Sequence, residues 1–441
     1  MNGSISLVGV DVLLYVLGIV FVLVGIALSI GLHELGHFLP AKRFGVSVRQ
    51  FMIGFGPTVY SRQRGETEFG FKALPLGGYI LMEGMYPPAQ KPYRGLFANW
   101  IREARKEIDE QQVAVALDKQ FHQLSTSKKI TIMLGGPMMN LFLGVVLIAT
   151  ALSGIGTLQN SLTVQQVYDC VDASSDGSCP AGAPPSPALA AGMQAGDRVV
   201  SVNGVDVANW SEVTDLMADR GQAPSTVVAL RDGANTALSI TPVFMERAVY
   251  DDQGSLQLDS AGVPITELRP ILGIRLEAET RPLPLADSLG YSLGATAAMF
   301  GFIADLPAQV YQVFASTFGT AERDPYGAVS VVGVGQLAGE LTAADIGVDA
   351  KLASLLMLLG SLNIALFAFN LVPLLPLDGG HVAGALYEGA KRRIVKATTG
   401  KDPGPVDTAK ALPVAYIVWL LLIVTGMILI LADLVNPITL G

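Results

Sequence analysis

Long apolar runs are the feature of this chain that most restricts its fold. A helix that crosses a bilayer needs about 20 apolar residues, and segments 13–31, 130–155 and 412–431 meet that requirement. A fourth segment, 351–377, is apolar after its first residue but contains asparagines and prolines, a composition typical of a helix that breaks around a buried site. The composition agrees, because 51% of the residues are hydrophobic and only 15% are charged. These runs predict an α-helical polytopic membrane protein with four transmembrane helices.

An H-E-x-x-H sequence continues the first apolar run. Residues four apart lie on one face of a helix, so His33 and His37 can converge on one Zn²⁺ with Glu34 beside them. In such sites zinc lowers the pKa of a bound water to roughly 7, and the glutamate accepts its proton. Short matches of this kind also arise by chance in soluble helices. Inside a bilayer, however, ionisable groups are costly and usually functional, so the motif predicts metal-assisted hydrolysis with a zinc cofactor.

A third zinc ligand is expected at the end of the irregular apolar segment. Asp378 is the only carboxylate in the run 351–380. An isolated aspartate at this depth costs about 2.5–3.5 kcal/mol on insertion scales, which metal coordination would offset. His381 is close enough to be a rival ligand, or it could be a polar cap at the cytoplasmic end of the span. The residues favour Asp378 and leave His381 as the alternative.

Charge asymmetry between the loops indicates the orientation in the membrane. Segment 41–129 contains fourteen Lys or Arg and eight Asp or Glu, whereas segment 156–281 contains seven arginines, no lysine and sixteen acidic residues. Because cytoplasmic loops carry an excess of basic residues, we expect the first segment to be cytoplasmic and the second to be external, with both termini external. This topology explains the basic residues, and no nucleic-acid motif accompanies them, so nucleic-acid binding is not expected.

The two cysteines of the chain, Cys170 and Cys179, both lie in the external segment. A pair confined to the oxidising side of a membrane is most simply a disulfide that closes a short loop. Two free thiols or a metal-binding pair are the alternatives, but no further Cys or His lies nearby. The predicted disulfide supports the topology.

The external segment also contains a motif that resembles a PDZ domain. Residues 191–204 match the pattern A-G-[LM]-x-x-G-D-x-[IV]-x-x-[IV]-N-G, with a strand predicted at 198–202 before an Asn-Gly turn. The rest of the fold is expected as a helix at 210–220, strands at 226–231 and 237–244, and an inserted loop at 246–267. PDZ domains add an extended peptide to a sheet edge, so this β-rich α+β domain is predicted to bind a peptide. A steric plug with an empty groove is the alternative, and gating by size is compatible with either.

Three motifs in order give the chain a family resemblance. They are the H-E-L-G-H sequence at 33–37, G-P-M-M-N at 136–140 and N-L-V-P-L-L-P-L-D-G at 370–379. The chain resembles the site-2 proteases of peptidase family M50, and within them the bacterial regulator of sigma-E protease group. The resemblance implies one set of catalytic residues, with zinc held by His33, His37 and Asp378 and with Glu34 as the base.

The same resemblance implies residues that bind substrate. Asn370 matches an asparagine that holds the substrate backbone, Pro373 follows it in the same motif, and Asn140 lies in the motif beside the site. Both asparagines could instead form interhelical hydrogen bonds. Pro373 and Pro376 are three residues apart rather than two, which departs from the familiar pattern.

A Gly-rich stretch at 54–84, with short strands expected at 69–74 and 79–82, resembles the membrane-associated β-hairpin loop of this family. It could pair with an unwound substrate by strand addition, and an ordinary cytoplasmic hairpin is the alternative.

Only one PDZ domain fits, which suggests the single-PDZ branch. Segment 283–318 is apolar but contains two aspartates, so we expect an interfacial helix or clamp rather than a fifth span. Mixed-sign charges in 94–120 predict a solvated helix, followed by a surface histidine, His122.

The expected protein is a multi-pass protein of the bacterial cytoplasmic membrane with an extracytoplasmic PDZ domain. Its predicted organisation is 1–40, first transmembrane helix; 41–129, cytoplasmic region with the hairpin loop; 130–156, second transmembrane helix; 157–282, external PDZ domain; 283–350, external amphipathic or clamp segment; 351–380, third transmembrane helix; 381–411, cytoplasmic loop; and 412–433, fourth transmembrane helix.

The resemblance implies a zinc metalloendopeptidase that cuts transmembrane segments of single-span membrane proteins, such as anti-sigma factors, after another protease has trimmed their external part. Expected partners are these substrates, membrane lipid and a peptide at the PDZ groove. The alternative is a noncatalytic membrane scaffold with structural zinc and a PDZ domain that recruits partners. A metal or proton transporter would need polar groups distributed through the spans, whereas this chain concentrates them at one site.

Overall fold

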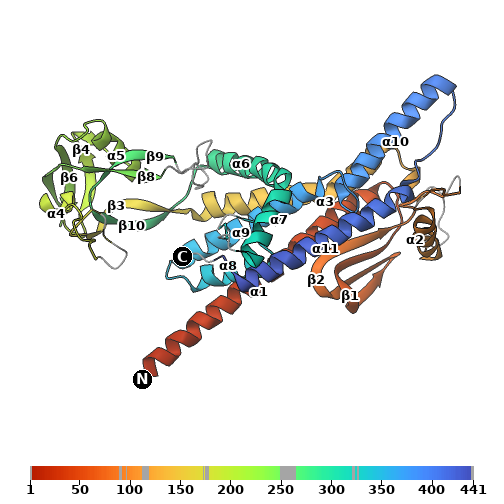
Figure 1. Cartoon of the computed structure of the whole chain (residues 1–441), viewed down its shortest axis with the longest axis horizontal. Coiled ribbons are helices and arrows are strands. Elements are labelled where there is room, and N and C mark those ends of the chain that lie inside the picture. Colours follow the sequence, from red (N-terminus) through yellow and green to blue (C-terminus); the bar gives the residue numbers. More distant parts are fainter. Residues whose placement is uncertain are drawn as a thin grey trace. The chain divides into compact units, whose positions relative to one another are not determined.

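The structure, a computed structural model, divides the chain into two compact units, Met1–Gly154 with Pro284–Gly441, and Ile155–Leu283. The first unit is mainly helical and the second is mainly β-sheet (Figure 1). The structure describes residues 2–88, 92–95, 97–111, 119–171, 173, 178–248, 265–319, 323–324 and 327–438.

Four helices in the described parts of the chain are long and apolar enough to cross a membrane, as the apolar runs predict. They are α1 (Asn2–Arg43), α3 (Thr126–Ala149, continued by a π-helical turn, η3, Thr150–Ile155), α9 (Val348–Asn370) and α11 (Leu412–Val435, preceded by a 3₁₀ turn, η4, Thr408–Ala411). Helix α3 packs against both α1 and α9. Helix α11 exposes most of its large apolar side chains, which is the surface that lipid would cover.

The third of these helices is shorter at its C-terminal end than the predicted span 351–380. Helix α9 ends at Asn370, and residues 371–377 form turns. Pro373 and Pro376 have no N–H group to donate to a preceding helical turn, so they stop the helix at this point.

A new helix, α10 (Asp378–Thr399), begins at Asp378. The connection predicted as a loop at 381–411 is therefore helical over more than half of its length. Helix α10 is closed by Gly400, whose φ of 70° is the left-handed conformation that glycine adopts most easily. Asp378 therefore opens this helix and does not close the preceding span.

In the described sequence between residue 284 and α9 there are three further helices, namely α6 (Leu285–Ala304), α7 (Leu306–Phe318) and α8 (Val331–Ala343). Helices α6 and α7 are bent by 69° at Asp305, and together they also satisfy the length and hydropathy required of a span. The described chain thus has four candidate spans, or five if this pair is one broken span. The interfacial placement of 283–318 stays a prediction.

A folded-over hairpin lies against α1, formed by β1 (Val48–Arg64) and β2 (Thr67–Met82). The first half of β1 pairs with both ends of β2, so that Phe51 is the partner of both Phe69 and Ile80. The strands extend well beyond the two short strands predicted here. Residues 78–82 form one edge of the resulting sheet.

Two short elements follow the hairpin, α2 (Ala98–Gln111) and a 3₁₀ turn, η2 (Phe121–Gln123). Helix α2 lies within the helix predicted at 94–120. The prediction of a surface position for His122 is wrong, because only 4% of this residue is exposed. Its ring lies 3.1 Å from the carbonyl oxygen of Gly84, and burial lowers the pKa of His122.

The described residues of the second unit form a six-stranded antiparallel sheet in the order β10-β3-β4-β6-β7, with β5 paired to β4, and a separate two-stranded sheet, β8-β9. Its elements are β3 (Thr157–Val167), α4 (Pro187–Ala190), β4 (Arg198–Val202), β5 (Val205–Asp206), α5 (Trp210–Ala218), β6 (Ser225–Arg231), β7 (Ala234–Ile240), β8 (Val243–Ala248), β9 (Thr266–Ile271) and β10 (Ile274–Arg281). Apolar side chains from the sheet and from α5, such as Val202, Val213 and Met217, form its core.

Most of the secondary structure predicted in this unit is present. The predicted strands 198–202 and 226–231 and the predicted helix 210–220 correspond to β4, β6 and α5. The strand predicted at 237–244 is divided between β7 and β8, which belong to different sheets. The inserted loop predicted at 246–267 falls largely on 249–264, outside the described residues. Cys170 and Cys179 are joined by a disulfide, with their Cα atoms 6.0 Å apart.

Candidate metal centre

Helix α1 carries three buried or partly buried polar side chains within little more than one turn. His33, Glu34 and His37 occur here because the apolar run continues as a helix through the motif. Glu34 is 7% exposed and His37 is 5% exposed. A Cβ added to Gly78 of β2 would lie 3.0 Å from Cγ of Glu34, so the edge strand of the hairpin passes directly beside this carboxylate.

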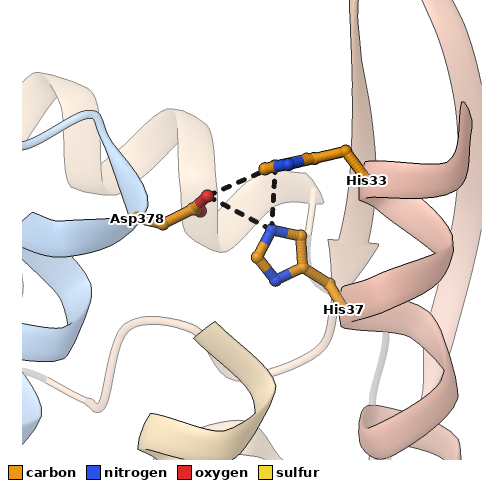
Figure 2. Close-up of side chains that lie close together, drawn as sticks. All are labelled: His33, His37 and Asp378. Atoms are coloured by element: carbon orange, nitrogen blue, oxygen red, sulfur yellow. Dashed lines mark hydrogen bonds and ion pairs between the residues drawn. The ribbon is translucent and has the colours of Figure 1, made fainter. Parts of the chain in front are cut away.

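Asp378 reaches the two histidines from the first turn of α10 (Figure 2). Its Oδ2 atom lies 3.3 Å from Nε2 of His33 and 3.3 Å from Nε2 of His37, and the two nitrogens are 3.1 Å apart. Among the described residues, this is the group of His, Cys, Asp or Glu side chains whose ligand atoms are close enough to share a metal ion.

The three atoms fit the donor set and the spacing of a zinc site. Atoms bound to Zn²⁺ at about 2.0–2.1 Å in a tetrahedron lie roughly 3.3–3.4 Å from one another. Oδ2 of Asp378 is buried and has no hydrogen-bond partner in the described part of the chain, so a cation between the three atoms would satisfy it. Three protein ligands also leave the fourth position open, as in catalytic rather than structural zinc sites.

Helix α3 orients both imidazole rings. Nδ1 of His37 lies 2.7 Å from the carbonyl oxygen of Ile132, and Nδ1 of His33 lies 3.1 Å from the side-chain amide of Asn140. A proton on Nδ1 that is donated to an oxygen leaves the lone pair of Nε2 free for a metal. Both Nε2 atoms face Asp378 (Figure 2). The carbonyl oxygen of Ile132 supplies the acceptor for His37, whereas the atom of Asn140 next to Nδ1 of His33 is the amide nitrogen Nδ2, so metal ligation by His33 requires this amide to be rotated with its oxygen toward the ring.

Glycines allow α1 and α3 to approach closely enough for these contacts. A Cβ at Gly36 or at Gly135 would overlap the backbone of the opposite helix, and a Cβ at Gly136 would overlap the ring of His37. The two helix backbones therefore meet at the level of the metal-binding side chains. Gly36 and Gly136 belong to the sequence motifs and Gly135 directly precedes the second one, but the role of all three depends on a contact between distant segments.

The other predicted substrate-binding residues lie on α3, at the end of α9 and in the turns before α10. Asn140 is 1% exposed and contacts His33. Asn370 is the last residue of α9, and Pro373 is exposed in the turns that lead to α10. His381 lies one turn after Asp378 but is not part of the ligand group.

Sequence reasoning missed two features near the site. The carbonyl of Ile132 carries no sequence signal, because any residue supplies a backbone oxygen. Lys129 and Glu388 form a buried ion pair, and the only available signal was a charged residue at the boundary of an apolar run. His381 lines one cavity with His122, Lys129 and Glu388.

The sequence profile of peptidase family M50 matches residues 21–401. Zinc metalloprotease Rip1 of Mycobacterium tuberculosis is 32% identical, and the match covers 97% of this chain and 100% of the relative. Zinc metalloprotease Rip1 of Mycolicibacterium smegmatis is 30% identical, with coverage of 97% and 99%. Metalloprotease MmpA of Caulobacter vibrioides is 26% identical over 87% of this chain and 89% of the relative.

Proposed function

Because the chain belongs to peptidase family M50 and is a zinc metalloprotease, we propose that it is an intramembrane endopeptidase that cuts transmembrane segments of single-span membrane proteins. The observation that carries the proposal is the cluster of His33, His37 and Asp378, two of whose members lie on a helix long and apolar enough to span a bilayer. Peptide hydrolysis at such a depth is the simplest use of a catalytic zinc site there.

The proposal assigns a role to each residue of the cluster. His33, His37 and Asp378 hold zinc, which when bound polarises the scissile carbonyl and acidifies a water. Glu34 accepts the proton of that water and passes it to the leaving amine. Its burial beside the cluster keeps competing solvent away from the proton transfer.

A substrate helix must unwind before it can be cut, because its carbonyls are held in internal hydrogen bonds. We assign Asn370 and Pro373 to holding the unwound backbone, at the end of α9 and in the following turns. The edge at 78–82 is available for strand addition, which supports pairing of the substrate with the hairpin next to Glu34. Asn140, predicted as a substrate-binding residue, is better suited to orienting His33, because it is buried against that ring.

The chain is an integral membrane protein, and the proposed topology follows the charge of its loops. Residues 157–282 would form the extracytoplasmic PDZ domain, supported by the order of β4, α5, β6 and β7, and would admit or bind the trimmed end of a substrate. Residues 41–129 would be cytoplasmic, with the hairpin at the membrane surface, and both termini would be external. The expected location is the bacterial cytoplasmic membrane.

The substrate class follows from the resemblance to proteases that act on regulators of transcription. We propose anti-sigma factors with one transmembrane segment, cut after another protease has removed their external part. A noncatalytic scaffold would need a closed zinc site with four protein ligands. Since the described residues offer three ligand atoms within reach of one another, catalysis is the better account.

The decisive test is Glu34→Gln in the full chain, purified in detergent and mixed with a reporter that contains one transmembrane helix. We expect the variant to keep its zinc, because Glu34 is not one of the three ligands, and to lose cleavage by at least a hundredfold, the lower end of the usual 10²–10⁴-fold contribution of a general base. Cleavage is measured by mass spectrometry of the reporter and zinc by elemental analysis.

His33→Ala and Asp378→Ala are the companion variants, and both should lose zinc and cleavage together. Full cleavage by Glu34→Gln with zinc bound would remove the general-base assignment. Wild-type protein that holds zinc but cuts none of several single-span reporters would favour the scaffold.

A further inference from the structure

A buried ion pair connects α3 to α10. Nζ of Lys129 lies 2.7 Å from Oε1 of Glu388, and the two side chains are only 4% and 5% exposed. The second carboxylate oxygen of Glu388 accepts a hydrogen bond from the backbone N–H of Val406 at 3.1 Å, and Arg392 approaches Oε1 at 3.6 Å. Glu388 is thus held by groups from three segments of the first unit.

An ion pair at such a buried position is a poor device for adding stability. Removing two charges from water is costly, and an apolar pair of similar volume often stabilises a protein at least as well. The best attested use of buried polar groups is to select one register of packed elements over others. The contribution of this ion pair therefore depends on which two helices it aligns, here α3 and α10.

These two helices support opposite sides of the metal centre. Lys129 precedes Ile132 by three residues, so the two lie on one face of α3, and Ile132 accepts the hydrogen bond from His37. Helix α10 supplies Asp378 from its first turn. A shift of α10 along α3 would therefore move the carboxylate relative to the two imidazoles.

Close packing beside the ion pair also restricts such a shift. A Cβ added to Gly389, the residue after Glu388, would lie 2.8 Å from Oγ1 of Thr126. The helices are in close contact here, and close-packed surfaces have few alternative registers. The charged pair and this glycine contact therefore specify the same alignment.

We propose that Lys129 and Glu388 are positioning residues that set the register of α10 on α3, and thereby the separation of Asp378 from the imidazoles of His33 and His37. The inference rests on the proposed assignment of these three residues as the zinc ligands. It adds a requirement for the metal site that lies in neither the ligands nor the residues that contact them.

The test measures zinc affinity of the purified full chain by competition with a chelator, together with kcat and KM for a single-span reporter. We expect Glu388→Gln and Lys129→Met to weaken zinc affinity at least tenfold, within the 10–100-fold range known for residues that support metal ligands. They should lower kcat by a similar factor and leave KM within threefold of wild type. Lys129→Arg keeps the charge and should remain within threefold of wild type in both readouts.

A second buried ion pair provides the matched control. Arg323 lies 2.6 Å from Asp433 of α11, with side chains that are 6% and 1% exposed. Asp433→Asn breaks a pair of the same kind on a different helix, so it should leave zinc affinity within threefold of wild type even if it lowers thermal stability.

The outcomes separate this inference from the proposed function. Wild-type protein without zinc would overturn the ligand assignment itself. Wild-type protein with zinc, and an unchanged affinity in Glu388→Gln, would overturn the positioning role alone, and so would an equal loss in Asp433→Asn. If Lys129→Met cannot be purified in folded form, Glu388→Gln and Lys129→Arg decide the question.

Discussion

At the scale of single residues, the metal centre depends on how each imidazole uses its two nitrogens. Both Nε2 atoms face Asp378, and both Nδ1 atoms face groups of α3. A ligand set of two histidines and one aspartate therefore needs an acceptor for each Nδ1 proton, which is the carbonyl oxygen of Ile132 for His37 and, with the amide rotated, Oδ1 of Asn140 for His33. The second of these can be changed by mutation.

Asn140→Ala should weaken zinc binding. Zinc ligation through Nε2 of His33 places a proton on Nδ1, whereas the structure puts the amide nitrogen Nδ2 of Asn140 3.1 Å from this atom and leaves Oδ1 without a hydrogen-bond partner in the described structure. Rotation of the amide by 180° exchanges its oxygen and nitrogen and lets Oδ1 accept this proton. Without this acceptor the ring loses its orientation, and we expect a loss of about 10-fold or more in zinc affinity. Chelator competition on the purified chain measures it.

Asn363→Ala is the control for this prediction. Asn363 is also 1% exposed, but its side-chain amide contacts the hydroxyl of Ser29 rather than a zinc ligand. An equal loss of zinc affinity in both variants would assign the effect to general destabilisation and contradict the role of Asn140.

At the scale of helices, the metal centre depends on the close approach of α1 and α3. Gly36 and Gly135 place the two backbones in direct contact, one turn from the carbonyl that binds His37. Small residues at such crossings are typical of helix pairs in membranes, where backbone contact replaces the hydrophobic effect.

Gly135→Ala tests this crossing. Helix propensity alone would stabilise α3 by up to about 1 kcal/mol, whereas the added methyl overlaps the carbonyl of Gly36 and should cost about 1–3 kcal/mol. We expect a lower thermal midpoint and lower zinc content, both measured in detergent.

Gly154→Ala adds the same methyl in η3, where the nearest atom is 3.7 Å away, and should be neutral. A thermal midpoint in Gly135→Ala equal to or above that of wild type would mean that the two helices separate at no cost, contrary to this account of the crossing.

At the scale of the whole molecule, two compact units have different sources of stability. The first unit buries some polar side chains, such as Asn140 and Asn363, between its helices. The second is a β-sheet unit with its own apolar core and a disulfide. Asp197 of the second unit is fully buried and paired with Arg231 at 2.6 Å. Hydrogen bonds from Arg231 hold the pKa of Asp197 below its usual range.

Acid should therefore weaken the second unit. A depressed pKa in the folded state means that the stability from this pair is fully present above the unfolded pKa of about 3.9 and is lost as the pH falls through the folded value. We expect the denaturant concentration at the unfolding midpoint of the second unit to decrease when the pH is lowered below about 4. Fluorescence of Trp210, which packs on the core, reports it in the full chain carrying Trp100→Phe and Trp419→Phe.

Asp197→Asn should cost about 2 kcal/mol at neutral pH and remove this part of the acid dependence. Asp206→Asn changes an exposed carboxylate of β5 and should alter neither. An unchanged acid profile in Asp197→Asn would assign the pH dependence to other groups.

Local physical rules account for what could be predicted along the chain. Apolar runs gave four candidate spans, because span length follows from bilayer thickness alone. The spacing of His33 and His37 predicted a shared helix face, and the segment 198–202 before an Asn-Gly turn predicted β4. The prolines in 351–377 indicated a broken helix, but the predicted span still ran to 380, ten residues past the end of α9. Such rules failed at His122, whose burial depends on segments that pack over it.

The sequence by itself determined the spans, the facing histidines and most strands of the second unit, since these depend on neighbours within a few residues. Only the tertiary structure decided that Asp378 reaches the two histidines, that Asn140 and Ile132 orient the two rings, and that Lys129 meets Glu388. Each of these is a contact between segments far apart in the chain, and such contacts depend on the close packing of whole helices, which no local pattern encodes.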